Sequence, residues 1–191
     1  MDTLETDWLQ RALQGDDEAF TWMVERYQTP VYNLCYRMLG ADPQAAEDAA
    51  QETFWRVYQN LKRYDPSRPF VTWLLSIAAH YCIDQQRRNH IVALPIDDLL
   101  EETAPSTAPD PEHIASRNEE AAAIQSILKG LNPPDRAAVI LRYWYDFSEE
   151  EIARALSLSV SAVKSRLHRT RLLLAQRWQD AHPDTGTLKR R

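Results

Sequence analysis

Cations gather near the C-terminal end of the chain, in a stretch without acidic residues. From Val160 to Trp178 there are five Lys or Arg residues and no Asp or Glu. Small and apolar residues recur here at three- and four-residue spacing, which predicts a helix with this inner face: Val160, Val163, Leu167, Thr170 and Leu174. The other side would carry mostly polar and cationic residues: Ser161, Lys164, Ser165, His168, Arg169, Arg171 and Leu172. Such a row of side chains can bind phosphates and base edges of DNA.

A shorter helix is predicted directly before this one. Ser148 can cap its first turn, and Glu151 completes a capping box. The segment 157–159 breaks the pattern, and Ser159 can cap the following helix. Ser157 stands where such turns often have glycine, because the residue adopts a positive φ. The sequence therefore predicts a helix-turn-helix whose second helix enters the major groove, and the alternative is a solvated basic face.

A polar patch is predicted on a helix in the first half of the chain. Asp48, Gln51 and Glu52 are spaced at i, i+3 and i+4, which places them on one side of that helix. The patch is either a solvated face or a docking surface for a basic helix of another protein.

Aromatic and cationic residues share a third segment, after a proline-containing loop at 64–69. The helix that follows, at about 70–88, has this predicted inner stripe: Phe70, Trp73, Leu74, Ile77, Ala78 and Tyr81. Its polar positions are Thr72, Ser76, His80, Asp84, Arg87 and Arg88. Aromatic rings beside cations can stack unpaired bases, but a stripe at helical spacing is more typical of a core, so Trp73 is predicted as core.

Composition predicts an all-α fold with two small helical domains joined by a flexible acidic linker. The 191 residues include only four glycines, and no strand-like alternation persists. Residues 89–116 hold six acids, four prolines and no Lys or Arg, which is typical of a linker. The predicted division is 1–90, a linker at 91–116, a second domain at 117–180 and a polar tail at 181–191.

The other helices follow from caps and breakers. One is expected at about 6–14, and a second begins after Asp16 and ends at Gly40, with Pro30 kinking or interrupting it. Asp42-Pro43 begins a helix that continues to about residue 62. In the second domain a helix is expected at about 115–129, and residues 132–135 (Asn-Pro-Pro-Asp) provide a turn and a cap for another.

Charge is divided unevenly. The formal net charge is −6, with 9 cations and 19 acids in residues 1–116 and 13 cations and 9 acids in residues 117–191. The first part should therefore repel a duplex unless a partner compensates, whereas the second could hold one.

Several classes of chemistry are disfavoured. Cys35 and Cys82 lie in apolar helical patterns, so buried thiols are expected rather than a metal site or a disulfide. No cofactor is expected, because the sequence has no metal-ligand cluster and no phosphate-binding loop. An enzyme using His80, Asp84 or Glu52 is the least favoured alternative, because no nucleophile–base pair supports it. Without an apolar span or a leader segment, the chain is expected to be soluble and cytoplasmic.

Three segments resemble bacterial RNA polymerase sigma factors. Residues 47–54 (EDAAQETF) are similar to the family's core-binding signature, residues 70–88 to its promoter-melting helix, and residues 148–171 to its minus-35-reading helix-turn-helix. Two modules and a linker resemble the short extracytoplasmic-function class, with domains that correspond to sigma region 2 and region 4. The likeness covers nearly the whole chain, with the three motifs in the family's order.

The resemblance implies a role for each group of residues. Asp48, Gln51 and Glu52 would contact the beta′ clamp helices of core polymerase. Capture of minus-10 bases, and binding of the adjacent phosphates, would fall to Tyr64, Ser67, Arg68, Phe70, His80, Arg87 and Arg88. At the position of His80 the family usually has Asn or another polar residue. Reading of minus-35 bases would fall to Lys164, Ser165, His168 and Arg169, with Arg166 and Arg171 on phosphates.

The resemblance also implies the partners. They would be core polymerase, through its beta′ clamp helices and beta flap, promoter DNA and an anti-sigma factor, with no small-molecule substrate. The acidic linker would pass through a polymerase channel that otherwise holds nucleic acid. The runner-up is a stand-alone helix-turn-helix regulator, which leaves the polar patch and the segment 64–88 without a purpose.

Overall fold

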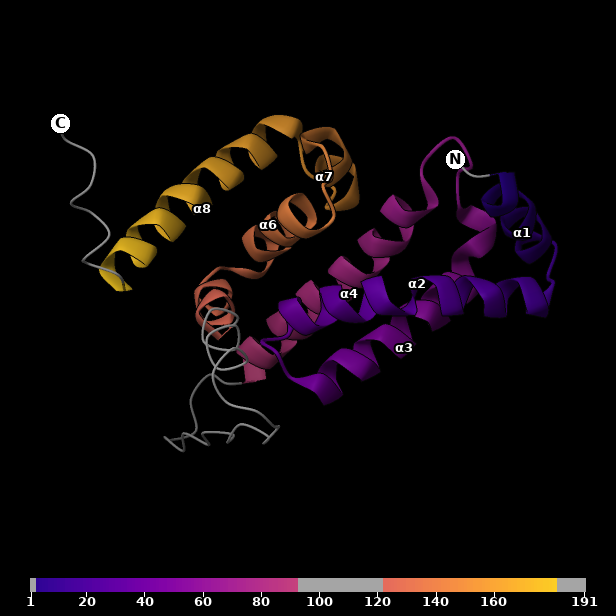
Figure 1. Cartoon of the computed structure of the whole chain (residues 1–191), viewed down its shortest axis with the longest axis horizontal. Coiled ribbons are helices and arrows are strands. Elements are labelled where there is room, and N and C mark those ends of the chain that lie inside the picture. Colours follow the sequence, from indigo (N-terminus) through magenta and orange to yellow (C-terminus); the bar gives the residue numbers. More distant parts are fainter. Residues whose placement is uncertain (1–2, 93–121, 182–191) are drawn as a thin grey trace, which may run out of the picture.

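The computed structural model describes residues 3–92 and 122–181, and every regular element in these two ranges is a helix (Figure 1). The all-α prediction is therefore confirmed for the described residues. The predicted linker from residue 93 on and the tail from 182 on lie outside them, as does the start of the helix expected at 115–129. Residues 91 and 92, which the prediction gave to the linker, are helical. Residues 122–129 are helical, and a turn follows at Gly130.

The first module contains four α-helices and a short 3-10 turn. They are α1 (Thr3–Leu13), α2 (Asp17–Met38), α3 (Pro43–Asn60), η1 (Leu61–Arg63) and α4 (Phe70–Val92). The caps expected from the sequence are confirmed, because Asp16 accepts from the N–H groups of Glu18 and Ala19, and Asp42 accepts from that of Ala45. α2 packs on α1, α3 and α4, which makes it the central helix of this module.

Pro30 does not interrupt α2, which continues without a break from Asp17 to Met38. Of the two expected outcomes at this residue, a kink or an interruption, the interruption does not occur. A proline inside a helix costs about 3 kcal/mol, but Val31, Leu34 and Cys35 directly after it are fully buried. Packing of α2 against three neighbouring helices thus outweighs the local preference.

More positions around α4 are buried than the predicted inner stripe contains. Leu74, Leu75, Ala79 and Cys82 are all fully buried, although only Leu74 belongs to that stripe. Trp73 packs against the hydrophobic core with its side chain partly exposed, so its assignment to the core is confirmed only in part. The physical reason is that α4 contacts α2 and α3 and also the second module. A single apolar stripe predicts only one buried face, so it cannot predict burial on two.

The second module follows the predicted order of helices. After the segment 122–129 come α6 (Pro133–Trp144), α7 (Glu149–Ala155) and α8 (Val160–Ala181). Asn132 caps α6 by accepting from the N–H of Asp135. α6 packs against both α7 and α8, and Figure 1 shows α7 and the start of α8 together at one end of the module.

Both cysteines are free and fully buried, as expected. A hydrogen bond with Cys35, together with burial, raises the pKa of the Cys82 thiol, so this thiol is protonated and unreactive at neutral pH. Within residues 3–92 and 122–181, no helix is long and apolar enough to cross a membrane, and no cluster of metal-ligating side chains occurs.

Candidate nucleic-acid and docking surfaces

The helix-turn-helix is formed by α7, a tight turn and the first half of α8. The Ser148 hydroxyl accepts from the Glu151 N–H at 3.2 Å, and the Glu151 carboxylate accepts from the Ser148 N–H at 2.8 Å, so the capping box is confirmed. Ser157 has a φ of 55°, which is the positive value expected at this turn. The Ser159 hydroxyl then caps α8 by accepting from the N–H of Ala162.

The outer side of α8 forms a polar surface, which we term the recognition face. It comprises Lys164, Ser165, His168, Arg169 and Arg171, all of which are exposed. The predicted inner residues Val163, Leu167 and Thr170 are buried. Within the described part of the chain the only ion pair on this face joins Lys164 to Glu149, at 3.5 Å and with Lys164 60% exposed. The face therefore presents cations that can meet the phosphates and base edges of a duplex.

Arg166 differs from the cations of the recognition face. Its Nη1 donates to Oδ1 of Asp135 in α6 at 2.5 Å, and the two side chains are only 27% and 13% exposed. The structure therefore directs this guanidinium toward α6, where it fastens α8 to its neighbour. To make the phosphate contact expected from the sequence, the Arg166 guanidinium would have to break its ion pair with Asp135.

A groove lies between α3 and α4 in the first module, with a volume of about 600 Å³. Two tryptophans and several polar side chains line it: Glu52, Trp55, Arg56, Gln59, Asn60, Arg63, Trp73, Ser76, Ile77 and His80. We term it the α3/α4 groove. Indole faces beside guanidinium groups form a surface on which unpaired bases can stack.

Only His80 of this lining was predicted as a site residue for nucleic acid. Its Nδ1 donates to the carbonyl of Ser76 at 2.8 Å, so in the neutral imidazole Nε2 is free to accept. The α3 side of the groove was not predicted to bind nucleic acid, although the sequence contains a signal for it. Glu52, Arg56, Gln59 and Arg63 follow one another at spacings of four, three and four residues, which places them on one helical face.

The loop at 64–69 is held by its own polar contacts. Oδ1 of Asp65 accepts from the Ser67 N–H at 3.0 Å, and Oδ2 pairs with Arg68 at 3.3 Å. Hydrogen bonds from Ser67, and then the Arg68 charge, lower the pKa of Asp65. Ser67 and Arg68 are exposed, as a role in binding requires.

Tyr64 and Phe70, the other two predicted site residues at this loop, are buried at 5% and 1% exposure. Their ring centroids lie 5.3 Å apart, and Phe70 also packs on Trp8 at 5.6 Å. The Tyr64 hydroxyl donates to the carbonyl of Arg68. Both rings thus support the loop from below and do not face solvent. Arg87 and Arg88 lie farther along α4 and are exposed.

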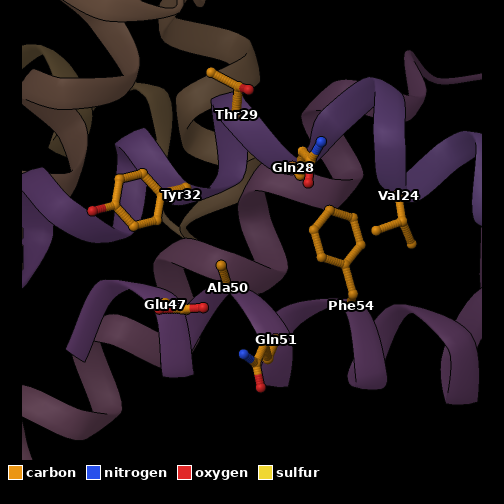
Figure 2. Close-up of a pocket in the computed structure, with 8 residues that line it drawn as sticks. All are labelled: Val24, Gln28, Thr29, Tyr32, Glu47, Ala50, Gln51 and Phe54. Carbon is orange, nitrogen blue, oxygen red and sulfur yellow. The ribbon is translucent and has the colours of Figure 1, made fainter. Parts of the chain in front are cut away.

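The polar patch on α3 divides between two grooves. Gln51 lines a groove of about 450 Å³ between α2 and α3, which we term the α2/α3 groove. Its lining is Val24, Gln28, Thr29, Tyr32, Glu47, Ala50, Gln51 and Phe54 (Figure 2). Glu52 instead lines the α3/α4 groove and pairs with Arg56 at 2.8 Å. Asp48 is exposed between them and accepts from Gln44.

Comparisons with known proteins agree with this arrangement. Residues 23–90 match the family described as Sigma-70 region 2, and residues 121–174 match Sigma-70, region 4. The ECF RNA polymerase sigma factor SigW of Bacillus subtilis (strain 168) is 33% identical over 90% of this chain and 95% of its own length. The ECF RNA polymerase sigma factor SigE of Mycolicibacterium smegmatis is 36% identical over 82% of this chain and 62% of its own length. The structure of CnrH in complex with the cytosolic domain of CnrY has a TM-score of 0.67 at 26% identity, covering 92% of this chain and 96% of that chain.

Proposed function

The chain belongs to the extracytoplasmic-function class of the sigma-70 family of RNA polymerase sigma factors, and from this premise we propose how its surfaces share the work of transcription initiation. As a sigma factor it binds core polymerase and promoter DNA. A stand-alone regulator is not favoured, because it would use only the helix-turn-helix and would leave the match over residues 23–90 without a purpose.

We assign minus-35 recognition to the recognition face of α8. Lys164, Ser165, His168 and Arg169 would contact base edges in the major groove, and Arg171 would contact a phosphate. Arg166 would act indirectly by keeping α8 in place through its ion pair with Asp135.

Capture of the minus-10 element belongs, in this proposal, to the α3/α4 groove and the adjoining loop. Trp55 and Trp73 would stack unpaired bases, with His80 Nε2 as an acceptor and Arg63 beside the backbone. Ser67 and Arg68 would hold the strand at the loop, and Arg87 and Arg88 would bind phosphates farther along α4. Tyr64 and Phe70 would position the loop from the core. Trapped bases offset an unstacking cost of a few kcal/mol, so melting needs no nucleotide hydrolysis.

Core polymerase would dock on both modules. Asp48, Gln51 and Glu52 would meet the beta′ clamp helices, with the neighbouring α2/α3 groove accepting apolar side chains. The beta flap would meet an apolar depression of about 480 Å³ on the second module, bordered by Ile124, Val139, Tyr143, Trp144 and Leu174.

The uneven charge supports joint action with polymerase. Alone, the acidic first part repels phosphates and few counterions are released on contact with DNA. Once polymerase presents both promoter elements, two weak contacts act as a linked pair. The acidic segment between the modules would occupy a nucleic-acid channel of the polymerase. We further propose the domain boundaries 1–90, 91–116 and 117–180, with a polar tail at 181–191.

Three further assignments follow from this role. The protein would act in the cytoplasm, where polymerase and the chromosome lie, and it would catalyse no reaction itself. CnrH is seen bound to the cytosolic domain of CnrY, and we propose that an anti-sigma factor likewise restrains this chain.

The observation that carries the proposal is the exposed cationic face of α8, in a chain whose two matched regions stand in the order of a sigma factor. The test is run-off transcription on a promoter library, with core polymerase alone and with this protein added. Transcripts with defined start sites should appear only when the protein is present. The proposal is wrong if the protein leaves start-site selection unchanged but binds an operator tightly by itself.

Two alanine variants separate base reading from phosphate binding. Arg169→Ala should cost about 1–3 kcal/mol on the best promoter and much less on promoters altered in the minus-35 element. Arg171→Ala should weaken all promoters to a similar degree, because phosphates carry no sequence. Equal losses across promoters for both variants would show that Arg169 contacts only the backbone.

A further inference from the structure

Helix α1 has no role in the function proposed above, and it lies outside the residues that match Sigma-70 region 2, which begin at 23. The helix is nevertheless part of the core, because Trp8, Leu9 and Ala12 are all buried. α1 packs against α2 and against η1, the turn that leads directly into the loop at 64–69. Figure 1 shows α1 at the end of the first module where this loop lies. α1 is therefore in a position to influence the loop.

Three buried aromatic rings connect α1 with the loop. Trp8 meets Phe70, the first residue of α4, with ring centroids 5.6 Å apart and ring planes at 85°. Phe70 meets Tyr64 in the same way, at 5.3 Å and 83°. Trp8, Phe70 and Tyr64 are only 6%, 1% and 5% exposed. Edge-to-face pairs of this kind favour one ring orientation over others, so Trp8 orients Phe70, and Phe70 orients Tyr64.

The Tyr64 ring in turn determines the shape of the loop. Its hydroxyl donates to the carbonyl of Arg68, which joins the first residue of the loop to the fifth. Inside this closure, the Asp65 carboxylate accepts from the Ser67 N–H at 3.0 Å, and the Asp65 carbonyl accepts from the Arg68 N–H at 3.1 Å. The turn presents Ser67 and Arg68 to solvent. Displacement of the Tyr64 ring would release the Arg68 carbonyl and, with it, the turn.

A loop held in this way receives an unpaired base at lower cost than a loop that samples many conformations. Ordering a loop on binding costs conformational entropy, and this cost is subtracted from the binding free energy. Where only a fraction of the molecules holds the loop in the receptive form, the apparent affinity falls by that fraction. Promoter melting is sensitive to such a loss, because base capture is what offsets the cost of unstacking.

We propose that Trp8 is a positioning residue for minus-10 capture. Through Phe70 and Tyr64 it holds the loop at 64–69 in the form that receives unpaired bases, so α1 takes part in promoter melting without contacting DNA. This inference rests on the proposed function, because it requires that the loop binds the melted strand. It adds to that function a residue and a helix that none of the DNA-binding and docking assignments includes.

Three variants test the two ends of this connection. Trp8→Ala removes the ring that orients Phe70. Trp8→Phe keeps an aromatic edge and loses no hydrogen bond, because Trp8 Nε1 is buried and has no partner among the residues that the structure describes. Tyr64→Phe deletes only the hydroxyl that binds the Arg68 carbonyl, so it breaks the connection at the loop without opening a cavity in the core.

Leu34→Ala is the matched control. Leu34 is fully buried in the same module, in α2, but it is not one of the rings that lead to the loop. Its truncation opens a cavity and lowers stability as Trp8→Ala does, so it separates a general loss of packing from release of the loop. Circular dichroism at the assay temperature establishes that each variant is folded, and Trp8→Leu replaces Trp8→Ala if the latter does not fold.

The readout is the rate of initiation by core polymerase saturated with each variant, on two templates. One is the duplex promoter, and the other carries mismatched bases across the minus-10 element, so that it is already open. Trp8→Ala and Tyr64→Phe should slow initiation about three- to tenfold on the duplex but less than about twofold on the open template, because no unstacking cost remains there. Trp8→Phe should restore most of the rate, and Leu34→Ala should leave the ratio of the two rates unchanged. The inference is overturned if Trp8→Ala keeps the wild-type ratio, or if Leu34→Ala changes the ratio equally.

Hydrogen exchange of the loop amides separates failure of this inference from failure of the sigma function. The N–H groups of Ser67 and Arg68 should exchange faster in free Trp8→Ala than in the free wild type, because both bind Asp65 within the turn. Faster exchange, together with a wild type that initiates on neither template, would show that the sigma function is wrong although Trp8 orders the loop. Initiation by the wild type, with unchanged exchange and an unchanged ratio in Trp8→Ala, would show that only the role of Trp8 is wrong.

Discussion

Arginine has three different roles in the second module, and burial distinguishes them. Arg169 is exposed on the recognition face, Arg166 is mostly buried against Asp135, and Arg136 is nearly inaccessible beneath backbone carbonyls. The sequence located the recognition face correctly as an outward surface, because the helical period separates it from Val163 and Leu167. It could not distinguish Arg166 from its neighbours, because the position of Asp135 depends on how α6 packs against α8.

The ion pair between Arg166 and Asp135 should contribute to stability. A double-mutant cycle with Arg166→Gln and Asp135→Asn, followed by urea unfolding, should give a coupling free energy of about 1 kcal/mol, because the pair is largely shielded from water. The cycle for Lys164 and Glu149 is the control, and this exposed pair at 3.5 Å should couple by less than about 0.5 kcal/mol. Equal coupling in the two cycles would contradict the anchoring role of Arg166.

Among the elements, those defined by neighbouring residues were predicted best. The caps at Asp16, Asp42, Asn132 and Ser148 all form as expected, because each depends on residues within three positions. The continuity of α2 through Pro30 and the full inner face of α4 depend on packing between distant segments, so the local pattern did not predict that Leu75, Ala79 and Cys82 are buried as well.

The turn at Ser157 should be more stable with glycine. A side chain at a φ of 55° costs about 1–2 kcal/mol, whereas glycine loses about 0.5–1 kcal/mol more entropy on folding. Ser157→Gly should thus raise the free energy of unfolding by up to about 1.5 kcal/mol, measured by urea denaturation. Ser157→Ala, which keeps the β-carbon, should stay within about 0.5 kcal/mol of the wild type. A glycine variant that unfolds at lower urea would show that the turn is not strained.

At the scale of the whole molecule, the order of three functional segments was visible in the sequence, but the surfaces that they form were not. Trp55 and Arg63 join His80 in one groove only because α3 packs against α4. The contact from Arg136 to Met38 joins residues 98 positions apart. No local pattern encodes such a distance, so neither the groove nor this contact between α6 and α2 could be predicted.

Docking on polymerase should depend on where acidic residues lie, not on how many there are. Asp48→Ala/Gln51→Ala/Glu52→Ala should weaken binding to core polymerase at least about tenfold, because docking residues at the centre of an interface dominate its affinity. Stability should change by about 1 kcal/mol or less, since these side chains are exposed or half-exposed. The control Asp17→Ala/Glu25→Ala also removes two negative charges, from exposed positions on α2, and should bind core polymerase like the wild type. If both variants lose affinity equally, binding responds to net charge and the patch on α3 is not the docking surface.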